Sequence, residues 1–209
     1  MRQPSVQRQS DRRLEILDAA QRCFVRSGFH GASMQEICAE AEMSPGNLYR
    51  YFPSKEALIA GICERNRAEA ADSFLAVDRA PAFFDGLAAL ARHHLVERPE
   101  EEAGLCAEIM AESRRNPDIA KLYQGIEHDI KERIAAMLRN AAERGEIRGD
   151  LDVDAAATVL MVLGDGMSWR RSVEPAFDAE AALPLILEMV HCLLAKKDNR
   201  AGNSAEPSP

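Results

Sequence analysis

The chain has 209 residues, of which 46% are hydrophobic, so it can build one or two domains with real cores and is not a disordered polypeptide. Its net charge of −8 argues against a protein that holds nucleic acid through its overall charge. The charge is uneven, however, because residues 1–55 carry eight lysines and arginines against six aspartates and glutamates. With this segment at +2 and the remainder at −10, the pattern fits a mildly basic binding head on an acidic body.

Helical periodicity dominates the chain and no segment alternates like a strand, which predicts an all-α fold. The first helix is expected from about Asp11 to Ser27, with Gly28 as its C-terminal stop. One of its faces is apolar and consists of Ile16, Leu17, Ala20, Cys23 and Phe24.

A short second helix is predicted to begin after Ser33, because a serine followed three residues later by Glu36 forms a capping box. Apolar residues then recur with the spacing of one helical face, at Met34, Ile37, Cys38 and Ala41. This helix therefore has one buried side.

A third helix is predicted to begin at Ser44 and Pro45, after a break at Glu42 and Met43. Serine is a good N-cap, and proline at the first helical position loses no hydrogen bond. Two short helices joined by a tight turn form a helix-turn-helix.

The two faces of the third helix differ in chemistry. Leu48 and Phe52 point to the core on a helical wheel, whereas Gly46, Asn47 and Arg50 fall on the opposite side. That side is predicted to read DNA, and the N–H groups at the helix start favour a phosphate. The candidate DNA-binding residues are Ser33, Ser44, Pro45, Gly46, Asn47, Tyr49, Arg50, Tyr51 and Lys55.

The remaining chain is predicted to be helical and acidic. A fourth helix should run from Ser54 to about Phe74 or Val77, long enough to link head and body. Further helices are expected at about Ala82–Val96, Glu101–Arg115, Asp118–Arg144, Val153–Ser172 and Ala182–Lys196, giving about nine. The last start is open, because Asp178 is a plausible cap but would place Pro184 inside the helix.

Three predicted regions follow: a DNA-binding helix-turn-helix domain at 1–60, a helical domain at 61–196, and a disordered tail at 197–209. No signal peptide opens the chain and no apolar run is long enough to span a membrane, so a cytoplasmic protein is expected.

Catalytic and metal chemistry find no support in the sequence. The five cysteines, at 23, 38, 63, 106 and 192, form no close pair, which favours free thiols over zinc ligands or disulfides. Glu188 and His191 match the Glu-x-x-His pair of di-iron bundles, but no second such pair exists. No phosphate-binding loop or nucleophile elbow occurs either, so we expect no enzyme, no metal and no cofactor.

Between Leu14 and Gly61 the chain resembles the TetR family of bacterial transcriptional regulators. The resemblance rests on Gly28-Phe29, Ala32-Ser33, Ile37-Cys38, Leu48-Tyr49, Phe52 and Ser54-Lys55-Glu56. One departure is Glu42, where family members often carry glycine; the position is expected to need a positive φ, at a cost of about 1 kcal/mol.

The resemblance implies a homodimer that binds an inverted-repeat operator in double-stranded DNA and responds to a small, largely apolar effector. It makes the helical domain at 61–196 the effector-binding and dimerisation domain. The last two helices are then expected to form the dimer interface, through Val159, Leu163, Gly166, Leu183, Ile186, Leu187, Val190 and Leu194. An ordinary core within one chain is the alternative for these apolar stripes.

Candidate residues for the effector cavity are Phe84, His93, His94, Cys106, Met110, Tyr123, Met137, Met161, Asp165 and Trp169. Aromatic residues and methionines are equally at home in a plain core. Asp165 stands in an otherwise apolar helix and must be paired, capped or in contact with a ligand; pairing with Arg170 or Arg171 is the simplest interpretation.

Two other functions compete with a ligand-released repressor. An architectural DNA-binding protein would use the same head without an effector, but a body of this size exceeds what dimerisation requires. A transcriptional activator would share every feature described above.

Overall fold

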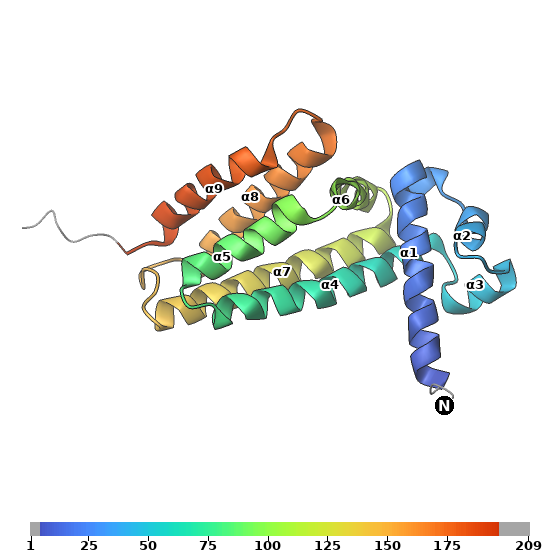
Figure 1. Cartoon of the computed structure of the whole chain (residues 1–209), viewed down its shortest axis with the longest axis horizontal. Coiled ribbons are helices and arrows are strands. Elements are labelled where there is room, and N and C mark those ends of the chain that lie inside the picture. Colours follow the sequence, from blue (N-terminus) through green and yellow to red (C-terminus); the bar gives the residue numbers. More distant parts are fainter. Residues whose placement is uncertain (1–4, 197–209) are drawn as a thin grey trace, which may run out of the picture.

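The computed structural model describes residues 5–196 (Figure 1). All the regular elements in this range are helices, which confirms the predicted all-α fold. They are α1 (Ser5–Gly31), α2 (Met34–Glu40), α3 (Pro45–Tyr51), α4 (Lys55–Arg79), α5 (Phe83–Arg92), the π-helical turn η1 (His93–Glu97), α6 (Glu100–Ser113), α7 (Pro117–Glu143), α8 (Val153–Val173) and α9 (Ala179–Leu194).

The molecule is elongated, with a small head at one end. Figure 1 shows α1, α2 and α3 at this end and the long helices α4 and α7 running side by side away from it. The head consists of α1 to α3 with the first turns of α4, and the remaining helices form the body. None of the helices within residues 5–196 is both long and apolar enough to cross a membrane.

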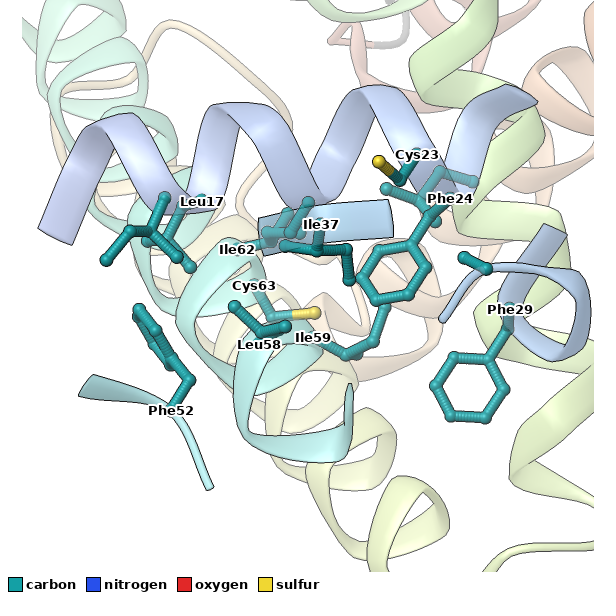
Figure 2. Close-up of a cluster of buried hydrophobic side chains, with 14 of the residues drawn as sticks. Leu17, Cys23, Phe24, Phe29, Ile37, Phe52, Leu58, Ile59, Ile62 and Cys63 are labelled. Atoms are coloured by element: carbon teal, nitrogen blue, oxygen red, sulfur yellow. The ribbon is translucent and has the colours of Figure 1, made fainter. Parts of the chain in front are cut away.

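A core of buried side chains holds the head together (Figure 2). Phe24 of α1, Ile37 of α2 and Leu58 of α4 are at most 1% exposed and point toward one another. The same cluster continues into the body through Leu105 and Ile109 of α6. Head and body therefore share apolar packing as well as the continuous helix α4.

The body has a second core, which joins the far ends of its helices. Val77, Phe83 and Leu138 are at most 2% exposed and pack with Ala157 of α8 and Leu194 of α9. This cluster fixes α8 and α9 against α5 and α7. The buried faces of α8 and α9 therefore belong to the core of one protomer.

Helix α1 is interrupted where the sequence predicted its end. Gly28 adopts φ 70° and ψ 168°, a conformation that is essentially restricted to glycine. The Glu108 carboxylate of α6 accepts a hydrogen bond of 2.6 Å from the Phe29 backbone N–H just beyond it. At its other end, α1 begins at Ser5, six residues before the predicted start at Asp11.

Two predicted helix boundaries need correction. Helix α9 begins at Ala179 and contains Pro184, because the Asp178 side chain accepts a hydrogen bond of 3.0 Å from the Ala181 N–H and so starts the helix early. The predicted helix 82–96 is divided into α5 and η1, with a change to π-helical bonding at His93. The predicted tail at 197–209 lies outside the described residues.

Candidate functional site

The helix-turn-helix forms by the local signals that its sequence contains. The Ser33 hydroxyl accepts a hydrogen bond of 3.2 Å from the Glu36 N–H, and the Glu36 carboxylate accepts one of 2.8 Å from the Ser33 N–H. This reciprocal arrangement confirms the predicted capping box at the start of α2. Ser33 is therefore tied to its own helix.

The turn between α2 and α3 adopts the backbone conformation that the family pattern suggested. Glu42 has φ 49°, the positive value for which glycine is the usual residue. The Arg12 guanidinium of α1 donates a hydrogen bond of 2.9 Å to the Ala41 carbonyl and thereby holds the end of α2. A contact with α1 thus supports the turn that positions α3.

Helix α3 presents a polar face to solvent. Leu48 and Phe52 are at most 1% exposed, which fixes the helix against the head core. The predicted reading residues on the other side are all exposed, namely Ser44, Pro45, Gly46, Asn47, Tyr49 and Arg50. The Ser44 side chain makes no capping bond in α3, and Tyr51 is half-buried against the core. The exposed face of α3 is the candidate nucleic-acid interface.

Lys55 has a structural role that the sequence did not reveal. Its ammonium donates hydrogen bonds of 2.5 Å to the Phe29 carbonyl and 2.9 Å to the Ala32 carbonyl, and it lies 4.7 Å from the centre of the Phe29 ring. Lys55 therefore ties α4 to the end of α1 and to the segment that follows it. The predicted phosphate contact of this residue stays a prediction.

The ten candidate effector residues do not form one group. Cys106 of α6, Tyr123 of α7 and Asp165 of α8 interact electrostatically, because these three helices pack on one another. Glu127, which the sequence analysis missed, joins them one helical turn after Tyr123 and accepts its hydroxyl hydrogen bond. We call these four residues the polar cluster.

Charge and partial desolvation act together in the polar cluster. Tyr123 and Glu127 are half-buried, whereas Cys106 and Asp165 are exposed at the surface of the protomer. Desolvation by the surrounding atoms raises the pKa of the Glu127 and Asp165 carboxyl groups, and the nearby Asp165 charge raises that of Glu127 further. The pKa of the Tyr123 hydroxyl is raised by burial and by the Glu127 carboxylate. A bound cation or hydrogen-bond donor would relieve this concentration of acidic groups.

Neither predicted arginine partner pairs with Asp165, so that interpretation is wrong. Arg170 pairs with Glu174 at 3.1 Å, one helical turn away. Arg171 donates hydrogen bonds to the Leu95 and Arg98 carbonyls, at 3.0 and 2.9 Å, at the end of η1. Both guanidiniums are thus engaged elsewhere.

The other candidate effector residues are dispersed over the body. Met137 is 3% exposed in the second core, and Met161 packs against it. Met110 and Trp169 are exposed, as is His93, which lies 3.5 Å from Glu97. Burial lowers the pKa of His94 to about 4, and its Nε2 has no hydrogen-bond partner among the described residues.

Two surface hollows lie on α5. One, of about 330 Å³, lies against α4 and is lined by Ser73, Ala76, Ala80, Pro81, Asp85, Gly86, Ala89 and Leu90. The other, of about 300 Å³, lies against α9 and contains Phe84, whose ring centre is 4.4 Å from that of His191. Phe84 is the one candidate effector residue that lines either hollow.

Helices α8 and α9 expose apolar side chains that are not part of the second core. This exposed apolar face consists of Val159, Val162, Trp169 and Val173 on α8 and Leu185 and Met189 on α9. Each is between 44% and 64% exposed, and all recur with helical spacing. Large exposed apolar patches on soluble proteins mark interaction sites.

The predicted dimer residues are divided between the two sides of these helices. Val159 and Gly166 are exposed, while Leu163, Ile186 and Leu187 are half-buried. Leu183, Val190 and Leu194 are at most 5% exposed, so their assignment to the interface is corrected: they are core residues of the protomer. The alternative interpretation of an intrachain core is right for these three.

Comparisons with known proteins agree with this division into head and body. The model "Bacterial regulatory proteins, tetR family" matches residues 16–62, and "BetI-type transcriptional repressor, C-terminal" matches residues 87–195. The HTH-type transcriptional regulator UidR of Escherichia coli strain K12 is 35% identical over 158 residues, 74% of this chain and 79% of UidR. The HTH-type transcriptional repressor AcnR of Corynebacterium diphtheriae is 27% identical, over 87% of this chain and 92% of AcnR.

Solved structures show the same architecture. GusR of Salmonella enterica superimposes with a TM-score of 0.74 at 34% identity, covering 88% of this chain and 95% of GusR. FadR of Bacillus subtilis, solved in complex with stearoyl-CoA, gives a TM-score of 0.74 at 19% identity, over 85% of this chain and 96% of FadR. The likeness to FadR concerns the fold alone.

Proposed function

The chain belongs to the TetR family of bacterial transcriptional regulators, and we propose that it is a repressor that binds an inverted-repeat operator as a homodimer and leaves it when a small molecule binds. The observation that carries the proposal is the exposed polar face of α3, held on a packed helix-turn-helix. Relatives named as repressors support the direction of regulation.

A homodimer is proposed because the exposed apolar face of α8 and α9 has no cover within residues 5–196. A second copy of the chain matches this face in size and chemistry, and a two-fold axis that runs through it along the long axis of the molecule would place both heads on one side. Two recognition helices related in this way require two half-sites related by the same symmetry.

The effector is proposed to bind in the body next to the polar cluster. The FadR structure contains stearoyl-CoA, so this fold can hold a ligand with a long apolar part. In this chain, the Glu127 and Asp165 carboxylates accept hydrogen bonds when ionised. A ligand that binds beside them therefore needs a hydrogen-bond donor or a cationic group at one end. The proposed ligand is therefore largely apolar with one such polar end.

The long helix α4 is the proposed lever between ligand and DNA. It begins in the head at Lys55 and ends in the body at Arg79. A ligand that prefers a conformation in which the distance between the two heads does not match the half-site spacing shifts the population away from the DNA-binding conformation. Such a coupling is usually worth about 1 to 3 kcal/mol, or about 5- to 150-fold in operator affinity.

Footprinting of the dimer on DNA selected from the source genome tests the proposal. We expect protection of two half-sites in inverted orientation, with centres about one helical turn or a multiple of it apart. Full affinity for a single asymmetric half-site would contradict the dimeric mode. Binding of equal strength to all sequences would favour the architectural alternative.

Arg50 and Lys55 are expected to differ when each is replaced by alanine. Arg50 has no partner among the described residues and projects from the reading face, so Arg50→Ala should relax the preference at particular base pairs by about 1 to 3 kcal/mol. Lys55→Ala should weaken binding to every sequence alike and flatten its salt dependence. Because Lys55 also holds two carbonyls, this variant should melt earlier than Arg50→Ala.

Titration of both variants against operators with single base-pair changes, together with thermal melting, checks this division. A uniform loss over the whole set for Arg50→Ala would show that the residue contacts phosphate rather than bases.

A further inference from the structure

Helix α1 extends well beyond the part that the head core requires. The match to the family model begins at residue 16, and Ile16 is the first buried residue of α1 among residues 8–31, for which burial is described. The helix nevertheless begins at Ser5, so its first eleven residues add roughly 16 Å of length at 1.5 Å per residue. Figure 1 shows this end of α1 reaching past α2 and α3, on the side opposite to α8 and α9.

The contacts of α1 fix the direction in which this extension faces. The Arg12 guanidinium reaches the Ala41 carbonyl at the turn before α3. The Arg13 guanidinium lies 4.3 Å from the centre of the Phe52 ring, at the end of α3. Arg8 precedes Arg12 by one helical turn and therefore leaves the helix on a similar side, about 6 Å further out.

Most of the cations in the head are already engaged. Arg22 and Arg26 share the Glu40 carboxylate, Arg65 pairs with Asp18, and Arg12 pairs with Glu15. Arg13 stacks on an aromatic ring and Lys55 binds backbone carbonyls. Among the described residues of the head, Arg8 and Arg50 are the cations for which no such partner is found.

We propose that the N-terminal turns of α1 form an arm whose Arg8 contacts the DNA backbone outside the half-site that α3 reads. The proposal rests on the proposed DNA-binding function. Arg50 supplies a free cation on the recognition helix and Arg8 supplies one beyond it, both on a head of net positive charge. A guanidinium suits a phosphate because it presents several donors in a planar fork.

The placement predicts where on the operator this contact falls. Because α8 and α9 carry the proposed dimer interface and the arm points the other way, each arm lies on the outer flank of its half-site. A phosphate contact should depend on the length of these flanks and not on their base sequence.

The test uses the full chain and its footprinted operator in two lengths, ending at the outer half-site edges or extended by about ten base pairs on each side. The wild type should bind the extended duplex more tightly, and Arg8→Gln should bind both equally. Loss of two phosphate contacts per dimer lowers the slope of log K against log salt by about 1.8. The penalty of Arg8→Gln should accordingly be about 12-fold larger at 50 mM than at 200 mM salt.

Two further variants separate charge from structure. Arg8→Lys keeps the charge and should keep most of the flank preference. Arg79→Gln removes an exposed arginine at the far end of α4 and should leave both flank preference and salt slope at the wild-type value. All three variants should melt like the wild type.

The proposed arm would be contradicted if Arg8→Gln kept the wild-type flank preference and salt slope. It would also be contradicted if the affinity depended on the base sequence of the flanks, or if Arg79→Gln changed the flank preference and salt slope as much as Arg8→Gln does. If the wild type binds DNA and Arg8→Gln behaves identically, the arm alone is refuted. If the wild type binds no DNA, the proposed function fails as well.

Discussion

Replacing Leu185 with aspartate is expected to give a folded monomer that has lost its operator. Leu185 is 64% exposed in the protomer and lies one helical turn before Met189 on α9, so the new charge meets water in the monomer. In a dimer it would be buried without a partner, which is strongly unfavourable. Losing the second head removes an avidity of about 10²- to 10⁴-fold, so operator affinity should fall at least about 100-fold.

Leu183→Asp is the matched control, because it places the same charge two residues away on the opposite side of α9. Leu183 is 1% exposed in the core, so this variant should unfold. Sedimentation velocity and thermal melting distinguish the two outcomes. An intact dimer for Leu185→Asp would move the interface to another surface.

Gly28→Ala is expected to lower the free energy of unfolding by about 2 to 4 kcal/mol. The backbone there, with φ 70° and ψ 168°, is strained for any residue with a Cβ. An added Cβ would also lie 3.0 Å from the Glu108 carboxylate, which holds the Phe29 N–H. For a chain of this length, such a loss lowers Tm by roughly 4 to 16 °C.

Gly31→Ala provides the comparison three residues later. Gly31 has no positive φ, and an added Cβ would meet only the Ser27 side chain at 3.4 Å. This variant should melt within a few degrees of the wild type. Equal stability of the two variants in thermal or denaturant unfolding would show that the α1 break does not depend on glycine.

The helix-turn-helix could be predicted from sequence because its signals are local. Ser33 and Glu36 define a cap within four residues, and the spacing of Leu48 and Phe52 fixes which side of α3 is buried. A local signal also located the break at Gly28, whereas the positive φ of Glu42 was predicted from the glycine that family members often carry there.

Features that depend on distant parts of the chain could not be predicted in this way. Helix α9 is apolar on two sides, and periodicity alone does not say that Leu183 faces the protomer core while Leu185 faces outward. The meeting of Tyr123 and Asp165 requires the packing of α7 on α8. The carbonyl contacts of Lys55 likewise join segments more than 20 residues apart.

The contacts between α6 and α1 give the head a second attachment. Glu108 holds the Phe29 N–H, and Glu112 lies 2.8 Å from the His30 ring nitrogen. Because α4 is the covalent connection and α6 holds α1 only by hydrogen bonds and packing, a displacement of α6 would rotate the head about α4. Cys106 of the polar cluster precedes Glu108 by two residues on this helix, so the proposed effector site and the second attachment of the head lie on the same element.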